Sequence, residues 1–498
     1  MSQLNDYDLL SDILSDKKFL PALEKEILHY LQKDELPSSV AHPLDADSLD
    51  VLRELKDSIQ DSKNLLYSNV GKLNAFWSKQ ITKAIQCLRL FDNREPFKQA
   101  PDKTIVAYGM ENLNKYYQSY TEFEGLLYGA NVHYRDHVIH VFRVWLIGLN
   151  VIIKKNFDVK SLDGLKDDWE HIGGLSKCEK ISMWTIIAFC HDLGYPLEKS
   201  KEILKVTQSM MQEIVTDSKI TADFSFVGTQ LSINEYIVKF ISTKMKNKGD
   251  IDKDNNKLYY GRVQPKYYLK LVKSLEEFKH GVVGAITIYK ALLYFLESDF
   301  NLNDDYQYSM EDARQFYIRR EILRAIASHT CSEIYNIKVT TFSSLLYISD
   351  ELQNWDRKDW HSLYSAQELK KSEVTINNFD EKSISYTEEI QIGPKADMKK
   401  FLCDLFMKQY DKYKKKFRDG QYTASREFDI TDNIVVEKNV DGTSKPKAEI
   451  TISIRGNSSS DSFSIKYNEH YQENDKIDES DIASSVFKHE FKIENSLT

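Results

Sequence analysis

The stretch ISMWTIIAFCHDLGYP, residues 181–196, joins an apolar segment to an abrupt polar end. The segment before the polar end is mostly apolar, which predicts a helix buried on most of its sides. His191 and Asp192 follow directly, and LGYP then ends the helix. An imidazole or a carboxylate without a partner is costly in an apolar interior. We therefore expect His191 and Asp192 to emerge together from a buried helix end as potential metal ligands.

Two other apolar helix patterns carry the same types of side chain. His137 and His140, in RDHVIHVFRVWLIGLN at 135–150, are three residues apart and should face the same side of one helix. Asp350 lies in LLYISDELQNW at 345–355, and a bound cation would remove the cost of burying its carboxylate. A mixed set of imidazoles and carboxylates suits Mn, Fe, Co, Ni or Zn better than Mg, although ligand type alone does not choose among these divalent metals.

The chain order of these residues matches a known signature. His140, then His191-Asp192, then Asp350, each in a predicted helix, resembles the H…HD…D signature of the HD superfamily. Members of that superfamily are mostly metal-dependent phosphohydrolases. The resemblance covers residues 135–357 and implies that these four residues bind a first metal ion, with Asp192 able to bridge to a second.

Two further histidines extend the resemblance. His280, in KHGVVGA, and His329, in AIASHT, lie between the HD pair and the final aspartate, where dinuclear members of the superfamily have two additional histidines. The resemblance implies that both bind a second metal ion or contact a substrate phosphate, so that one or two ions are held. His137 resembles a nearby histidine that some cyclic-nucleotide phosphodiesterases use as an acid, at a different spacing. Together with His329 and Asp192, it is a candidate for catalysis.

Residues for substrate binding flank these segments. Arg135 lies just before His137 and His140, and Lys201 follows the HD pair, so both could pair with the phosphates of a substrate. Tyr195 stands where many HD proteins have the lysine or histidine of HDxGK or HDxGH. We assign Arg135, Lys201 and Tyr195 to the substrate site.

The resemblance implies hydrolysis of a phosphoester or phosphoanhydride in a small-molecule nucleotide. The long insertion and the flanking segments are similar to those of (deoxy)nucleoside triphosphate triphosphohydrolases, in which such elaborations build oligomers, so a homo-oligomer is expected. Three other functions stay open. They are a phosphodiesterase acting on cyclic or linear oligonucleotides, a di-iron oxygenase with the same six ligands, and a nucleotide sensor without catalysis.

Composition bounds the class of protein. The chain has 498 residues, 41% of them hydrophobic and 29% charged, which predicts a folded chain with more than one folding unit. A net charge of −9 argues against DNA or RNA partners, sequence-specific binding included. The 5 cysteines have no paired spacing, the first residues do not form a secretory signal, and the apolar run at 141–153 is too short for a bilayer. We expect a cytoplasmic protein without a membrane segment.

Hydrophobic periodicity predicts a mainly α fold: an all-helical HD-type core at 131–360 with a helical N-terminal segment at 1–130. Within the core, 200–278 is expected to be an insertion of amphipathic helices with a solvated loop at 246–257. The last part, 361–498, is expected to be a small α+β region with a polar tail that begins near NSSSDS. Its predicted elements are a helix at 396–418, a turn at Asp441-Gly442, and strands in SEVTINNF, SISYTEEIQI, NIVVEKN and AEITISIR.

Overall fold

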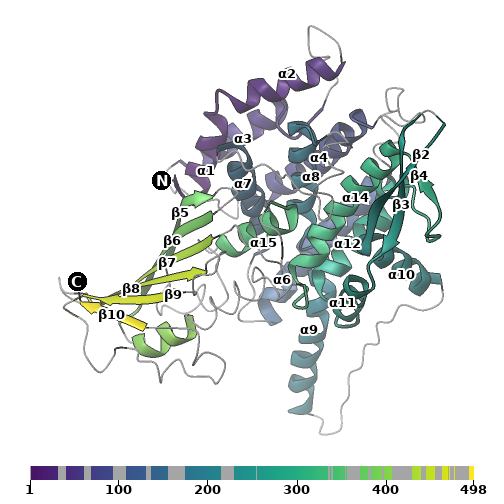
Figure 1. The fold of residues 1–498 in the computed structure, drawn as a ribbon. Coiled ribbons are helices and arrows are strands. Elements are labelled where there is room, and N and C mark those ends of the chain that lie inside the picture. The colour runs from purple at the N-terminus through teal and green to yellow at the C-terminus, as the bar shows by residue number, and fades with distance from the viewer. Residues whose placement is uncertain are drawn as a thin grey trace.

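The computed structural model shows a mainly helical chain with two small sheets (Figure 1). The larger sheet lies at one side of the helices, and the smaller sheet lies at the opposite side. The mainly α fold class is thereby confirmed. The residues that the structure describes are 2–31, 41–60, 69–92, 108–130, 136–154, 174–214, 229–253, 255–334, 337, 340–353, 355, 371–379, 383–394, 397–405, 429–438, 445–454, 462–468, 470, 476 and 493–497.

Helix α8 (Lys177–Cys190) lies at the centre of the helical part. It packs against α4 (Val70–Leu90), α7 (Val138–Lys154) and α14 (Met310–His329). Trp184 of α8 donates from its indole N–H to the carbonyl oxygen of Trp145 in α7 at 3.0 Å. Gly148 makes room for the same indole, because a Cβ at that position would lie 2.0 Å from Trp184 Cζ2. The buried helical core expected from the apolar runs is therefore present.

Helix α14 brings charged side chains into this core. Its residues from Ala313 to His329 are all buried. Arg319 Nε donates to the carbonyl oxygen of Tyr294 at 2.6 Å, and Arg320 donates to that of Thr243 at 2.8 Å. These two arginines hold elements together and are not placed to bind a substrate. The neighbouring helices are α12 (His280–Ala291), α13 (Leu293–Leu296) and α15 (Phe342–Leu352).

The N-terminal helices begin at side-chain caps. Asn5 accepts the backbone N–H of Asp8 at 2.8 Å, and Asp45 accepts that of Ser48 at 3.0 Å, so each carboxyl or amide oxygen satisfies an N–H that the helix leaves open. The helical periodicity predicted in this part of the chain is confirmed. Besides α4, the helices are α1 (Asp6–Leu14), α2 (Phe19–Leu31), α3 (Ala46–Ser58) and α6 (Met110–Ala130).

The expected insertion of amphipathic helices with a solvated loop at 246–257 is wrong at residues 243–251 and 257–263, which are strands. Here β2 and β3 form an antiparallel hairpin, extended by β4. Thr243 and Met245 are buried, while Lys246 and Lys248 are exposed, so the lysines of the polar run lie on the solvent side of a strand. The hairpin docks on α14 through the Tyr317 hydroxyl, which donates to the Met245 carbonyl oxygen at 3.1 Å. The elements of this region are α9 (Tyr195–Gln212), α10 (Thr229–Ser242), β2 (Thr243–Ile251), β3 (Lys257–Val263), α11 (Pro265–Glu276) and β4 (Gln307–Tyr308).

The larger sheet confirms the four strands predicted near the C-terminal end. Ala448, Ile450 and Ile452 are buried and Glu449 is exposed, as period-two alternation requires. The expected polar tail is wrong in part, because it contains β9 and β10, which pair in parallel. In the described residues the sheet order is β1 (Ser2–Gln3), β5 (Lys371–Phe379), β6 (Ser383–Ile392), β7 (Asp429–Lys438), β8 (Lys447–Ile454), β9 (Ser462–Tyr467) and β10 (Ile493–Leu497).

Two predicted elements of this region lie partly or wholly outside the described residues. Residues 398–405 are helical, and the rest of the helix predicted at 396–418 lies mostly outside the described residues. The predicted turn at Asp441-Gly442 also lies outside them. Among the described residues, no helix has the length and apolar character needed to cross a membrane.

Candidate metal centre

The turn after α8 places two ligands at the meeting point of four helices. Helix α8 ends at Cys190, and the N–H of Leu193 turns back to the Cys190 carbonyl oxygen at 3.3 Å. Gly194 then passes so close to α12 that a Cβ on it would lie 2.2 Å from the His280 carbonyl oxygen. The Tyr116 hydroxyl of α6 donates to the Leu193 carbonyl oxygen. The turn is held rigidly, and it points His191 and Asp192 toward α7, α12, α14 and α15.

Asp192 lies at the centre of a group of imidazoles. Its Oδ2 is 3.4 Å from His191 Nε2 and 3.7 Å from His140 Nε2. Its other oxygen, Oδ1, is 3.2 Å from His280 Nε2 and 3.8 Å from His329 Nε2. His137 Nε2 also lies 3.8 Å from Oδ2. Imidazoles therefore approach both oxygens of the carboxylate, which is the arrangement that a bridging ligand requires.

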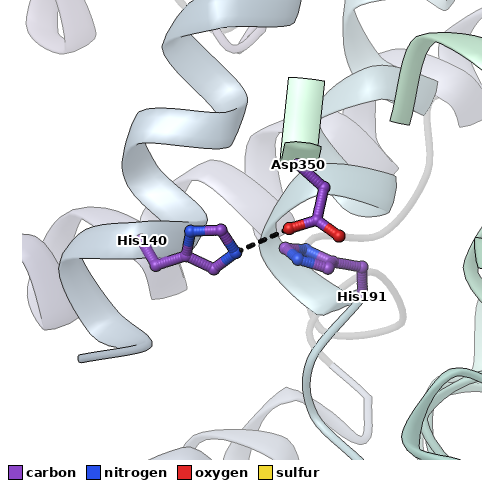
Figure 2. A group of neighbouring side chains, drawn as sticks. All are labelled: His140, His191 and Asp350. Atoms are coloured by element: carbon purple, nitrogen blue, oxygen red, sulfur yellow. Dashed lines mark ion pairs between the residues drawn. The ribbon is translucent and has the colours of Figure 1, made fainter. Parts of the chain in front are cut away.

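Asp350 completes the group on the Oδ2 side. Its Oδ1 is 3.0 Å from His140 Nε2, and Figure 2 shows His191 beside this pair. The ligand atoms of His140, His191 and Asp350 all lie within 4.8 Å of one another, and so do those of His191, Asp192 and His329. The Asp350 side chain is 27% exposed, so this carboxylate is half-buried and not buried as expected.

Each imidazole is oriented by a contact at its other nitrogen. The Nδ1 atoms of His191 and His329 lie 2.8 Å and 2.6 Å from the backbone carbonyl oxygens of Ala188 and Ile326. A carbonyl oxygen only accepts, so both Nδ1 atoms carry the proton and both Nε2 atoms offer a lone pair. This outer contact is the usual way in which proteins orient a metal-binding histidine.

The other two imidazoles are held by side chains. His140 Nδ1 lies 2.5 Å from Oε1 of Gln353, and His280 Nδ1 lies 2.6 Å from Oε2 of Glu198. The Glu198 carboxylate also accepts the backbone N–H of His280 at 2.8 Å. All four Nε2 atoms are thus directed toward the carboxylates of Asp192 and Asp350 by contacts at Nδ1.

The donor spacing fits a metal ion. Two ligand atoms that each lie about 2.1 Å from a tetrahedral ion are about 3.4 Å apart, close to the separations around Asp192. His191 Nε2 is buried and has no hydrogen-bond partner among the described residues. A buried polar atom without a partner is costly, and a metal bond would satisfy this one. These His and Asp residues could therefore hold a metal ion.

The electrostatics keep both aspartates ionised. Burial opposes this, but the surrounding imidazoles outweigh it: His191 holds the pKa of Asp192 well below its usual range, and His140 does the same for the pKa of Asp350. The cluster thus stabilises positive charge beside two carboxylates, and a bound cation supplies such charge without protonating the ligands.

His280 and His329 differ in their electrostatics. Burial alone would lower the pKa of His280, but hydrogen bonds to Asp192 and Glu198 raise it to about 9. The same contact lowers the pKa of Glu198 to about 2, against the effect of burial. For His329, burial prevails and lowers the pKa. The surroundings of these two imidazoles thus shift their pKa values in opposite directions.

His137 lies beside the ligands and between two acids. Its Nε2 is 3.8 Å from Asp192 Oδ2, its Nδ1 is 3.4 Å from Glu124 Oε1, and its backbone N–H donates to the same Glu124 oxygen at 2.7 Å. Burial, aided by the Glu124 charge, raises the pKa of neighbouring Asp136 to about 6. The predicted common facing of His137 and His140 is confirmed, since both approach Asp192.

The structure places one of the three residues assigned to the substrate site at the centre and does not describe the side chains of the other two. Tyr195 lies at the centre, with its ring centroid 4.1 Å from that of His137 and 5.2 Å from that of His280. Lys201 lies in α9, but its side chain is outside the described part of the chain. Arg135 lies outside the described residues altogether.

Sequence reasoning missed three residues that position the histidines: Glu124, Glu198 and Gln353. Glu198 had a local signal, because an acidic residue in the first turn of a helix that begins just after the HD pair must lie near that pair. Gln353 is one helical turn after Asp350, a spacing that places both side chains on one side. Glu124 had no comparable signal, since it belongs to a helix without a metal-ligand pattern.

Comparison with known proteins finds no matching family model, no matching curated protein and no matching solved structure. The case for a function accordingly rests on the arrangement of residues in this chain.

Proposed function

We propose that this chain is a metal-dependent phosphohydrolase of the HD type that acts on a nucleotide, with a (deoxy)nucleoside triphosphate as substrate. One observation carries the proposal: four histidine Nε2 atoms converge on the two oxygens of Asp192, and each Nδ1 is held from outside. Such oriented imidazoles around an ionised carboxylate are typical of catalytic metal sites.

Two ions fit the proposal better than one. His140, His191 and Asp350 would hold the first ion with Asp192 Oδ2, and His280 and His329 would hold the second with Asp192 Oδ1. A divalent ion in such a site lowers the pKa of bound water and polarises a phosphoryl oxygen. Mn, Fe, Co, Ni, Zn and Mg all remain candidates for its identity.

The surrounding side chains supply what a phosphate ester requires. His137, backed by Glu124, can give or take a proton beside Asp192 Oδ2, which is a general acid–base role. The Tyr195 ring forms a flat wall between His137 and His280. Lys199 Nζ lies 5.4 Å from the centroid of that ring, so one cation stands near the centre for an anionic substrate, whereas Lys279 is paired with Glu198 and Glu277.

The test is a product analysis. Purified protein is incubated with dNTPs, NTPs and cyclic nucleotides under each divalent metal, and the products are separated. Release of intact triphosphate from a (deoxy)nucleoside triphosphate is the expected result. Asp192→Ala should abolish turnover and lower the metal content, whereas His29→Ala, a change at an exposed histidine, should do neither.

Other outcomes would replace the proposal. Monophosphate from a cyclic substrate would identify a phosphodiesterase, and iron-dependent oxygen uptake would identify an oxygenase. Nucleotide binding without any product would identify a sensor. If Asp192→Ala retained activity and metal content, the site itself would be wrong.

A further inference from the structure

The side chain of Gln353 has only one orientation that satisfies its neighbours. Its Nε2 donates to the Trp355 carbonyl oxygen at 3.0 Å, and its Oε1 lies 2.5 Å from His140 Nδ1. Since a carbonyl oxygen accepts only, the amide nitrogen must face Trp355 and the amide oxygen must face His140. His140 Nδ1 then carries the proton, and Nε2 is left with the lone pair that a metal needs. Gln353 is fully buried, so water does not compete for these contacts.

The Trp355 carbonyl oxygen is itself held by Arg143. Arg143 donates to it at 3.3 Å, and its guanidinium lies 5.6 Å from the centre of the Trp355 ring. Arg143 is also three residues after His140 in α7, so both side chains leave the helix on one side. The position of Trp355, and with it that of Gln353, therefore depends on where the guanidinium is fixed.

Asp6 fixes the guanidinium. Its two carboxylate oxygens accept from Nε and one terminal nitrogen of Arg143, both at 2.8 Å, which is the two-pronged pairing that holds an arginine most rigidly. Both residues are buried, Asp6 at 0% exposed and Arg143 at 2%. Each contact thus continues the last, from Asp6 to Arg143, the Trp355 carbonyl, Gln353 and His140.

The backbone around Asp6 is anchored on its own account. Strand β1 pairs with β5 through Ser2 and Gln3, and the N–H of Leu4 donates to the Val374 carbonyl oxygen at 2.7 Å. Asn5 then caps α1, whose first residue is Asp6. The carboxylate is therefore presented to Arg143 by a segment tied to the larger sheet, at a distance along the chain from every candidate ligand.

We propose that Asp6 is a positioning residue of the metal centre, which acts through Arg143, the Trp355 carbonyl and Gln353 to hold His140 in the metal-binding tautomer. The inference rests on the proposed metal centre. It predicts that metal affinity depends on a residue with no contact to any ligand.

The test is a titration of the full-length apo protein with Co²⁺, whose visible absorption reports the coordination. Asp6→Asn should weaken binding at the His140 side about tenfold and change the spectrum, as loss of an outer contact does in metal sites. Gln353→Met should have a similar effect. In the double variant, Asp6→Asn should add nothing to Gln353→Met, because both changes break one chain of contacts.

Asp12 offers a matched control. It belongs to the same helix as Asp6 and accepts from Asn150 of α7 at 3.2 Å, without a link to Gln353. Asp12→Asn should therefore leave the Co²⁺ affinity and spectrum as in wild type. If Asp6→Asn does not fold, Arg143→Lys replaces it, since a lysine can still pair with Asp6 but does not reach Asp6 and Trp355 together.

The outcomes distinguish a failure of the relay, meaning the chain of contacts from Asp6 to His140, from a failure of the proposed metal centre. Wild-type Co²⁺ affinity and spectrum in folded Asp6→Asn or Arg143→Lys would overturn the inference, and so would additive losses in the double variant. An unchanged affinity in His140→Ala would instead overturn the proposed metal centre. A loss in His140→Ala together with wild-type binding in Asp6→Asn would refute the relay alone.

Discussion

Gly194 lies in the turn that follows α8 and carries His191 and Asp192. One methyl group added there should affect one half of the proposed metal centre and spare the other. The φ of Gly194 is −83°, so alanine strains no backbone angle there, and any effect comes from contact. A Cβ would lie 2.2 Å from the His280 carbonyl oxygen and 2.8 Å from the Gly284 nitrogen, both backbone atoms of α12. Ordinary contact needs about 3.4 Å, so Gly194→Ala must push the start of α12 away by about 1 Å.

That displacement moves the histidine at the start of α12. His280 is the first residue of α12, and its Nε2 lies 3.2 Å from Asp192 Oδ1. Metal–ligand distances tolerate errors of about 0.2 Å, so a shift of about 1 Å should remove His280 as a ligand. The distances that group His140, His191 and Asp350 involve no residue of α12. For the proposed two-ion centre, we expect Gly194→Ala to keep one ion and lose the other, with overpacking costing about 1–3 kcal/mol of stability.

The assay is metal content after dialysis against Mn²⁺, with thermal unfolding measured in parallel. Gly71→Ala is the control, because a Cβ at Gly71 meets nothing within 4 Å. It should keep the wild-type metal content. Two ions bound to Gly194→Ala with wild-type affinity would refute the reasoning, as would loss of the ion on the Asp350 side with the other retained.

Three further changes test other contacts. Glu124→Gln should lower turnover about 10²–10⁴-fold at unchanged metal content, because it removes the carboxylate beside His137. Steady-state kinetics and metal analysis measure the two quantities, and full activity would show that Glu124 has no part in the reaction. Glu198→Gln should weaken binding of the second ion about 10–100-fold in a metal titration, because Glu198 orients His280. Wild-type affinity would mean that His280 keeps its orientation without the carboxylate. Burial lowers the pKa of His42 to about 4, so the unfolded chain binds more protons below pH 6.5, and stability should fall by about 1 kcal/mol by pH 5.5. Denaturant unfolding of His42→Asn should lack that slope, and an equal slope in both proteins would assign it elsewhere.

The local periodicity of the sequence was enough to predict several elements. Residues 138–154 and 342–352 are helices because apolar side chains recur with the helical period, and the spacing of His137 and His140 put both imidazoles on one side. The alternation in residues 448–452 predicted a strand for the same reason. In each case the signal lies within one element, where neighbours in the sequence are neighbours in space.

The contacts that orient the ligands had no such signal. Gln353 meets His140 across 213 residues of chain, and Glu198 meets His280 across 82, so only the packing of whole helices brings these pairs together. The hairpin at 243–263 was missed because only Thr243 and Met245 are buried at the start of its first strand, and the polar residues that follow them show no apolar alternation. The sequence by itself determined which residue types enter the centre and on which helices they lie. The tertiary structure alone decided which oxygen of Asp192 each imidazole approaches, because that depends on how helices distant in the chain pack around α8.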